Sequence, residues 1–236
     1  MPRFILDPEA WGEKSALTGD EAKHCARVLR AQVGDSITVF DGLGRSAEAE
    51  VLSVSKDRVG LRLGESVIEP APSVDVVLAQ AVIKGKAMDW LLQKAVELGV
   101  SEIQPLATRY AVVRPGEGKE EKWQRIVLEA CKQCGRSRVP KVHPVLEIEE
   151  FLKKTTTGAR AMASLESGAE PLRTFLSEQP EIEKLTYLVG PEGDFSPEEY
   201  SKSRDNGYIP VNLGAPVLRS ETAAIYCLTA ASYVYS

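Results

Sequence analysis

Apolar and polar positions alternate with two different rhythms along the chain. Up to about residue 69, short alternating runs predict strands at residues 4–6, 36–40, 47–54 and 59–63, with one helix opening near Thr18. The sequence Thr18-Gly19-Asp20-Glu21 has the spacing of a capping box, in which a hydroxyl and a carboxylate satisfy the first free N–H groups of a helix. We therefore expect residues 1–69 to form a compact β-barrel or sandwich with one helix.

Strands and helices alternate after the proline-containing segment 69–73. Apolar runs predict strands at residues 74–82, 103–107, 159–165, 185–189 and 211–213. Helical spacing predicts helices at residues 86–98, 120–135, 147–154, 172–177 and 221–235. Such alternation is typical of a parallel sheet covered by helices, so residues 70–236 are expected to form an α/β domain.

Two glycine-containing loops each follow a predicted strand and precede a helix. The first, residues 190–193, reads Gly-Pro-Glu-Gly and is followed by Ser196, Pro197 and Glu199, which have the spacing of a second capping box. The second contains Gly214 and Pro216 and precedes the last helix. Glycine lets the backbone approach a ligand closely, and α/β proteins bind ligands beyond the carboxyl ends of their strands. The two loops together predict a cofactor site.

Several common catalytic signatures are missing from the chain. There is no G-x-G-x-x-G, which disfavours a standard dinucleotide site, and no G-x-x-x-x-G-K-[ST], which excludes a P-loop NTPase. Only two histidines are present, which disfavours a Ser-His-Asp triad and a metal site with histidine ligands. Cys131 and Cys134 form a lone C-x-x-C without a second pair, which is more typical of ordinary thiols than of zinc ligands.

The polar groups near the two loops favour catalysis by positioning. They are backbone N–H and C=O groups, three carboxylates and the single cation Arg219. Main-chain groups suit a purine ligand, and alignment of reactants needs no covalent intermediate. The three carboxylates are Glu192, Asp194 and Glu221.

Composition and charge restrict the partners. The chain is 43% hydrophobic and 27% charged, as ordinary globular proteins are, and its net charge of −5 argues against a nonspecific nucleic-acid coat. Lys132, Arg136, Arg138 and Lys141 nevertheless form a basic run without acids, which suits a polyanion bound at one place. No apolar run approaches the roughly 20 residues of a transmembrane helix, and no signal-peptide pattern is present, so we expect a cytoplasmic protein.

In their order along the chain, these motifs resemble those of a known family. Residues 190–193 followed by Phe195 and Ser196, with Leu213-Gly214 and the sequence Leu-Arg-Ser-Glu-Thr-Ala at 218–223, are similar to the paired motifs of SPOUT methyltransferases. They resemble the RsmE family in particular, whose members methylate N3 of a uridine in 16S ribosomal RNA. Further similarity lies at residues 3–4, 24, 28–30, 34–35, 41–42, 94–100, 129–133, 135–136 and 139–140.

The resemblance implies a fold, a cofactor and partners. Residues 70–236 would form a SPOUT-type α/β domain whose parallel sheet is tied into a deep trefoil knot. Residues 1–69 would form a small PUA-like β-barrel that binds RNA. The cofactor would be S-adenosylmethionine with no metal, and the enzyme would be a homodimer acting on 16S rRNA of the small ribosomal subunit, without a membrane partner.

The resemblance also implies roles for individual residues. Catalytic roles are expected for Arg219, Glu221 and Arg136. Cofactor contacts are expected from the two loops and their neighbours, at Leu165, Leu188, Gly190, Pro191, Glu192, Gly193, Leu213, Gly214, Val217, Leu218, Thr222 and Ala223. RNA contacts are expected at Arg3, His24, Arg27, Arg30, Lys132, Gln133, Arg136 and Arg138.

Two positions depart from the family pattern and leave a second function open. Asp194 stands where the family has a further glycine, and Pro216 stands where it has a basic residue. The alternative is a non-catalytic RNA-binding or ribosome-assembly protein on the same fold; a third interpretation is a nucleotide-binding α/β enzyme of another kind. Arg219 and Glu221 also fit a solvated helix start, and the basic run also fits a solvated surface.

Overall fold

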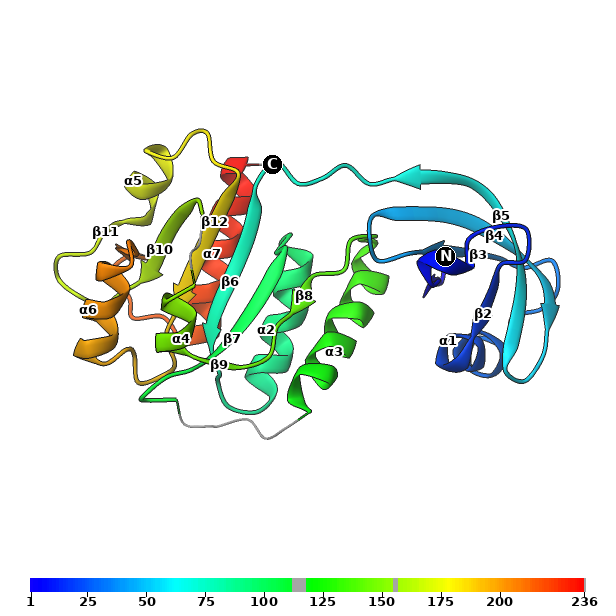
Figure 1. Cartoon of the computed structure of the whole chain (residues 1–236), viewed down its shortest axis with the longest axis horizontal. Helices are drawn as coiled ribbons and strands as arrows, with labels where there is room; N and C mark the ends of the chain where they lie inside the picture. The colour runs from blue at the N-terminus through cyan, green and yellow to red at the C-terminus, as the bar shows by residue number, and fades with distance from the viewer. Residues whose placement is uncertain (112–117, 155–156, 236) are drawn as a thin grey trace. The chain divides into compact units, whose positions relative to one another are not determined.

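The computed structural model describes residues 1–111, 118–154 and 157–235 (Figure 1). Contacts divide the chain into two compact units, one of Met1–Ala71 with Glu129–Val139 and the other of Pro72–Leu128 with Pro140–Ser236. The expected domain boundary after residue 69 stays a prediction, and the compact units are not consecutive along the chain. Within the described residues, no helix has both the length and the apolar character needed to cross a membrane.

A parallel sheet forms the centre of the second unit. In the described part of the chain it has eight strands in the order β11-β13-β10-β12-β6-β7-β8, with β9 beside β7, and every paired strand runs parallel to its neighbour. The strands are β6 (Asp75–Ala81), β7 (Glu102–Ala107), β8 (Lys141–Val142), β9 (Leu146–Glu147), β10 (Ala159–Ala163), β11 (Glu170–Pro171), β12 (Lys184–Val189) and β13 (Ile209–Asn212). The predicted parallel sheet is confirmed; the two-residue strands were too short to predict.

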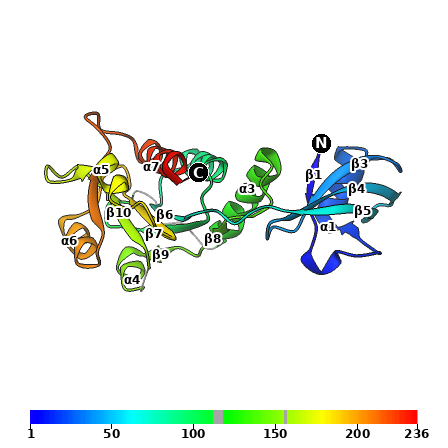
Figure 2. The same cartoon turned by 90° about the horizontal axis from the view of Figure 1, so that it is seen from above.

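Helices cover both faces of this sheet, which is why β6 and β12 are buried along almost their whole length. Figure 2 shows α2 and α7 on one face and α4 and α6 on the other, and the members of each pair contact one another. The helices are α2 (Lys86–Glu97), α3 (Lys119–Cys134), α4 (Ile148–Leu152), α5 (Leu172–Ser177), α6 (Pro197–Asp205) and α7 (Ser220–Tyr235).

The order of the strands determines where the loops lie. The chain enters the sheet near its middle at β6, extends one side through β7 and β8, and builds the other side with β10 to β13. Because β10 lies between β12 and β13, the loops that follow these three strands emerge next to one another. Pairing order does not define whether the chain is threaded, so the trefoil knot stays a prediction.

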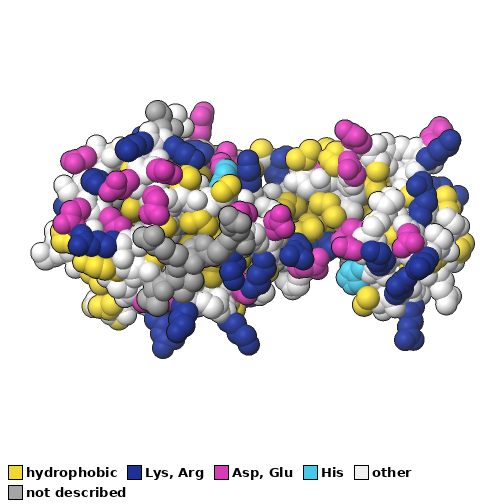
Figure 3. All heavy atoms as spheres, turned by 60° about the horizontal axis from the view of Figure 1, so that its bottom comes forward, with side chains coloured by type: hydrophobic (Ala, Val, Ile, Leu, Met, Phe, Trp, Pro, Cys, Tyr) yellow, Lys and Arg dark blue, Asp and Glu magenta, His cyan; other side chains and the backbone are white. Residues whose placement is uncertain are grey.

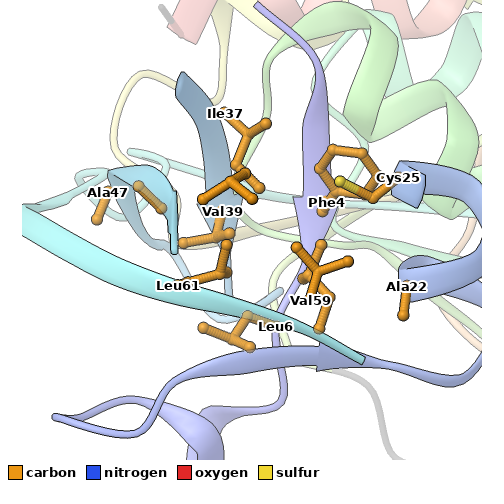
Figure 4. Packing of buried hydrophobic residues seen from close by; sticks show 12 residues of the cluster. Phe4, Leu6, Ala22, Cys25, Ile37, Val39, Ala47, Val59 and Leu61 are labelled. Atoms are coloured by element: carbon orange, nitrogen blue, oxygen red, sulfur yellow. The ribbon is translucent and has the colours of Figure 1, made fainter. Parts of the chain in front are cut away.

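The N-terminal unit is built on a five-stranded sheet in the order β1-β3-β4-β5-β2. β1 runs parallel to β3, and the other pairs are antiparallel. Figure 4 shows Phe4, Val39 and Leu61 packed with Cys25 in the core of this unit. The elements are β1 (Arg3–Ile5), the 3-10 helix η1 (Pro8–Ala10), β2 (Ala16–Thr18), α1 (Gly19–Lys23), the π-helix η2 (His24–Val28), β3 (Ser36–Phe40), β4 (Arg45–Val54) and β5 (Arg58–Ile68).

The predicted capping box at Thr18 is wrong. Thr18 precedes α1, but its side chain makes no capping hydrogen bond. The carboxylate of Glu21 instead accepts hydrogen bonds from the Ile5 N–H at 3.0 Å and from Lys132 Nζ at 2.6 Å. Glu21 therefore links α1 to β1 and to the end of α3. A local spacing rule cannot predict such contacts because both partners are distant in sequence.

The capping box at Ser196 is confirmed. Ser196 Oγ accepts from the Glu199 N–H at 3.2 Å, and Glu199 Oε2 accepts from the Ser196 N–H at 2.8 Å. Pro197 occupies the first turn of α6, where no N–H is needed. Ser196 is almost fully buried, so water cannot replace its hydroxyl at the start of this helix.

We expect Ser196→Ala to lower the free energy of unfolding by about 1 kcal/mol, because the first N–H groups of α6 lose their acceptor. Ser201→Ala is the matched control, since Ser201 is exposed on the same helix. The control should stay within about 0.5 kcal/mol of the wild type. Urea unfolding followed by circular dichroism measures both variants, and equal stabilities would contradict the capping role.

The four cysteines are free thiols that differ in exposure. Cys25, Cys131 and Cys227 are buried and Cys134 is exposed. Burial raises the pKa of the Cys131 and Cys227 thiols to about 12. No group of three His, Cys, Asp or Glu side chains in the described residues is arranged to hold a metal ion.

Iodoacetamide at about pH 8 should therefore label Cys134 in the native protein and leave the three buried thiols unmodified, because the thiolate is the reactive form and must be accessible. Peptide mass spectrometry before and after unfolding in urea measures the sites. If Cys131 were labelled in the native protein as fast as Cys134, the prediction that Cys131 is buried in solution would be wrong.

Candidate active site

One cavity of about 470 Å³ lies at the carboxyl ends of β10, β12 and β13. Its walls are the three loops that follow these strands, and the first residues of α7 close it. Residues 163–166 form the first wall, residues 189–192 with 194 the second, and residues 212–220 with Ala223 the third. The two predicted glycine loops are therefore opposite walls of the same cavity.

Most residues predicted to contact a cofactor line this cavity. They are Leu165, Gly190, Pro191, Glu192, Leu213, Gly214, Val217, Leu218 and Ala223. Leu188, Gly193 and Thr222 do not line it: Leu188 is packed in the core beneath, and Thr222 is exposed on α7. For all twelve residues, those that line the cavity and those that do not, contact with a cofactor stays a prediction.

Sequence reasoning missed most of the wall after β10, including Ser164 and Glu166, and also Asn212 and Ser220. The wall belongs to the site because β10 pairs with both β12 and β13, although these strands are far apart in sequence. The only signal was the pair of polar residues Ser164 and Glu166 at the end of the strand predicted over residues 159–165. That pattern cannot reveal which strands are neighbours.

Packing explains the two glycines of the first loop. A Cβ on Gly190 would lie 3.2 Å from the Phe195 ring, and a Cβ on Gly193 would lie 3.0 Å from Tyr110 Cβ. Both distances are shorter than an ordinary van der Waals contact, so a larger residue would require its neighbour to shift. In the second loop, Gly214 has φ +115°, a backbone conformation that favours glycine. These glycines thus shape the walls, and only some of them face the cavity.

Ser220 connects the start of α7 to the first glycine loop. Its hydroxyl donates a short hydrogen bond to the Gly190 carbonyl and accepts one from Gln80 Nε2 at 2.9 Å. Gln80 is fully buried in β6, and its Nε2 also donates to the Ala81 carbonyl at 2.9 Å. A buried hydrogen-bonded network of this kind holds two walls of the cavity in fixed positions from a central strand.

The charges that line the cavity are mostly acidic. Glu166, Glu192 and Asp194 face one cation, Arg219. Glu166 is paired with Arg204 at 2.5 Å. Arg219 is exposed and forms no ion pair with any residue that the structure describes. The site therefore offers carboxylates for a ligand with positive charge and one guanidinium that is open to a second, negatively charged group.

Two large aliphatic side chains at the cavity are unusually exposed. Leu165 is 63% exposed and Val217 is 74% exposed, and they come from two different walls. Exposed apolar groups beside a cavity suggest a ligand that covers them. A flat aromatic ring is a suitable partner, because it presents apolar faces to both side chains and polar edges to backbone N–H and C=O groups.

The predicted catalytic residues are not gathered at one place. Arg219 lines the cavity. Glu221 lies in the first turn of α7 and is partly buried, but it does not line the cavity. Arg136 belongs to the N-terminal unit, where its carbonyl accepts a hydrogen bond from Arg3. The catalytic roles of all three stay predictions.

All residues predicted to contact RNA lie in the N-terminal unit. The side chains of three of them form hydrogen bonds or ion pairs with other residues of this unit. Arg3 donates to Ser137 Oγ at 2.9 Å, and Lys132 pairs with Glu21. The Arg138 guanidinium donates to the carbonyls of Leu43 at 2.8 Å and Glu69 at 3.0 Å. These contacts hold residues 129–139 to the β-sheet of this unit, which is a structural role that the basic run did not predict.

The other predicted RNA contacts are more open. Arg27, Arg30 and Gln133 are exposed, and His24 is partly buried with its ring edge against Phe4 at a centroid distance of 5.7 Å. Arg27 lies in the π-helix η2, and Arg30 lies two residues beyond its end. Arg27 and Arg30 are therefore the predicted cations with the most accessible charge.

Comparison with known proteins gives one consistent result. The model of an RNA methyltransferase domain matches residues 69–232, and the model of an RNA methyltransferase PUA domain matches residues 17–63. The ribosomal RNA small subunit methyltransferase E of Synechocystis is 32% identical, with 96% of this chain and 75% of that protein covered. The Bacillus subtilis protein of the same name is 29% identical, with 92% and 89% covered.

Solved structures agree along the whole chain. A ribosomal RNA small subunit methyltransferase E from Neisseria gonorrhoeae, bound to S-adenosylmethionine, has a TM-score of 0.89 at 30% identity and covers 100% of this chain and 98% of its own. A methyltransferase from Legionella pneumophila, also with this cofactor bound, has a TM-score of 0.88 at 29% identity, with 98% and 96% covered. The chain belongs to the ribosomal RNA small subunit methyltransferase E family.

Proposed function

We propose that this protein transfers a methyl group from S-adenosylmethionine to N3 of a uridine in 16S ribosomal RNA. The observation that carries the proposal is the cavity between the two glycine loops, in a member of a family whose solved structures bind this cofactor. The non-catalytic alternative was motivated by Asp194 and Pro216. Asp194 is accommodated by its own hydrogen bonds, and Pro216 lies in a wall of an intact cavity, so the enzyme is favoured.

The lining of the cavity fits S-adenosylmethionine. Its volume lies within the roughly 300–1,000 Å³ of small-molecule sites. Leu165 and Val217 offer apolar contact to an adenine ring, and the loop backbones offer hydrogen bonds to its edges. Glu166 and Glu192 carry the negative charge that a cationic sulfonium and an amino group require.

The reaction needs alignment and charge stabilisation from the protein. S-adenosylmethionine supplies an electrophilic methyl group on a positively charged sulfur. N3 of uracil becomes a nucleophile only when its proton leaves, and Arg219 would stabilise the negative charge that develops on the neighbouring oxygen. Glu221 would orient the base from the first turn of α7. The catalytic role of Arg136, which belongs to the other compact unit, stays a prediction. Fixed loops lower the barrier because the reacting groups are already aligned.

RNA recognition is proposed for the N-terminal unit, through Arg27 and Arg30 and the other residues predicted there. Figure 3 shows Lys and Arg side chains interspersed with Asp and Glu on the face drawn, so RNA would bind at local basic sites. A ribosomal RNA substrate supports a cytoplasmic location, which is part of this proposal.

Methyl transfer to isolated small subunits and to naked 16S rRNA, both lacking this modification, tests the proposal. We expect one methylated uridine, mapped to N3 by nuclease digestion and mass spectrometry. Calorimetric binding of S-adenosylmethionine without transfer to either substrate would favour the non-catalytic protein. Binding of ATP or NAD in place of S-adenosylmethionine would favour another nucleotide enzyme.

Arg219→Ala should lower kcat for methyl transfer by about 100-fold at saturating RNA, because the developing charge on the base loses its cation. Arg219→Lys should retain part of the rate. Arg173→Ala is the matched control, since Arg173 is exposed on α5 and does not line the cavity. An unchanged kcat for Arg219→Ala would remove Arg219 from the mechanism.

We also propose that the protein is a homodimer that pairs through α7. Tyr226 is 48% exposed and Tyr233 is 86% exposed, and their spacing along with Thr222 places all three on one side of the helix. The opposite side of α7 packs against α2 and β12. Exposed tyrosines in a row are typical of a surface that a second subunit covers.

Tyr226→Glu should convert the dimer to a monomer, because it places an unpaired carboxylate in a desolvated contact. Sedimentation velocity measures the mass. Leu52→Glu is the control, since Leu52 is similarly exposed and belongs to β4 of the other compact unit. A monomeric wild type, or a dimeric Tyr226→Glu, would contradict pairing through this helix.

A further inference from the structure

Asp194 has a backbone conformation that side chains seldom adopt. Its φ is +62°, and among the described residues only Arg30 shares a positive φ without being glycine. The left-handed region is unfavourable for a residue with a Cβ, although Asp and Asn are the best tolerated because their side chains form local hydrogen bonds. The strain persists only when neighbouring contacts hold it. Asp194 must therefore be fixed by specific interactions.

Those interactions fold the carboxylate back under the glycine loop. Asp194 Oδ1 accepts a hydrogen bond from the Phe195 N–H at 2.8 Å, and the Asp194 N–H donates to the Pro191 carbonyl at 3.0 Å. The same oxygen lies 3.3 Å from the position that a Cβ on Gly190 would take. The carboxylate thus fills the inside of the turn formed by residues 190–194.

The hydroxyl of Tyr200 on α6 is the external partner of this carboxylate. It lies 2.8 Å from Asp194 Oδ1 and 2.9 Å from Oδ2, and the ring is almost fully buried. Burial raises the pKa of the Tyr200 hydroxyl, so it stays protonated and donates at neutral pH. Tyr200 also packs in a buried cluster with Met162 of β10 and Leu188 of β12. Its hydroxyl therefore ties the glycine loop to α6, and its ring packs α6 onto the strands beneath the cavity.

We propose that Asp194 and Tyr200 form a clasp that holds the glycine loop against α6 and so pre-organises the cavity for S-adenosylmethionine. The identity of the ligand rests on the proposed function. The clasp acts before the ligand arrives, because ordering flexible loops on binding costs affinity. Asp194 is a positioning residue in this role, and the aspartate that departs from the family pattern replaces a flexible glycine with a fixed turn.

A direct role of charge makes a different prediction. Asp194 lines the cavity, so its carboxylate also faces a bound sulfonium. Attraction to that charge favours S-adenosylmethionine and gives nothing to S-adenosylhomocysteine, whose sulfur is neutral. A geometric clasp serves both molecules equally, because both need the same walls. The ratio of the affinities for S-adenosylmethionine and S-adenosylhomocysteine therefore distinguishes a positioning role of Asp194 from a direct charge role.

Isothermal titration calorimetry of S-adenosylmethionine and S-adenosylhomocysteine tests the clasp in four variants. Asp194→Gly keeps the backbone conformation without strain and removes the carboxylate, and Tyr200→Phe removes only the hydroxyl. Each should weaken both ligands by about tenfold, the value of one hydrogen bond to a charged group. The double variant should lose no more than either single variant. Asp194→Asn keeps an acceptor oxygen and should bind both ligands nearly as the wild type does.

Hydrogen exchange without ligand provides the second measurement. The amides of Asp194 and Phe195 should exchange faster in Asp194→Gly and in Tyr200→Phe. Tyr235→Phe is the matched control, because its hydroxyl donates to the Gln179 carbonyl away from the cavity, and exchange at the loop should not change. A wild type that binds no S-adenosylmethionine would refute the proposed function, while the exchange rates would still test the clasp.

Three results would overturn the clasp: unchanged affinities in Asp194→Gly and Tyr200→Phe, additive losses in the double variant, or a loss confined to S-adenosylmethionine. Unchanged amide exchange in both single variants would do the same. Loss of both ligands together with faster exchange, and recovery in Asp194→Asn, is the result that supports it.

Discussion

The parallel pairing of β10 with both β12 and β13 is the constraint on which the site depends. Hydrogen bonds between backbones place the ends of these strands side by side, and therefore place three loops around one cavity. Each loop alone is a turn with a few polar groups. Main-chain pairing gives them a common position, and the buried Gln80 and Ser220 then fix the first glycine loop to the start of α7.

The basic residues of the N-terminal unit show that charge alone does not identify an RNA contact. Lys132 and Arg138 lie in a run without acids, yet Lys132 pairs with Glu21, and Arg138 donates to two carbonyls. Gly44 permits this arrangement, because a Cβ there would lie 2.8 Å from Arg138 Cζ. A cation whose donors are used within the protein contributes less to phosphate binding than an exposed one such as Arg27.

Local patterns predicted the elements of the fold well, and they predicted the site in part. Ser196 and Glu199 form the capping box that their spacing predicts. Thr18 and Glu21 have the same spacing but form no box, because the Glu21 carboxylate accepts hydrogen bonds from Ile5 and Lys132 instead. The glycine loops were recognisable because glycine and proline follow apolar strands. The wall after β10 and the position of Asp194 depend on strand order and on Tyr200, which no short spacing in the sequence encodes.

The contacts of residues 129–139 have a consequence for synthesis. The N-terminal unit includes a segment that the chain reaches only after β6, α2, β7 and most of α3 have been made. Until that segment leaves the ribosome, Arg3 lacks the Ser137 hydroxyl and Glu21 lacks the Lys132 ammonium. Domains usually fold in order as they emerge. The first sheet therefore gains its contacts with residues 129–139 only after β6 and β7 of the second unit have been made.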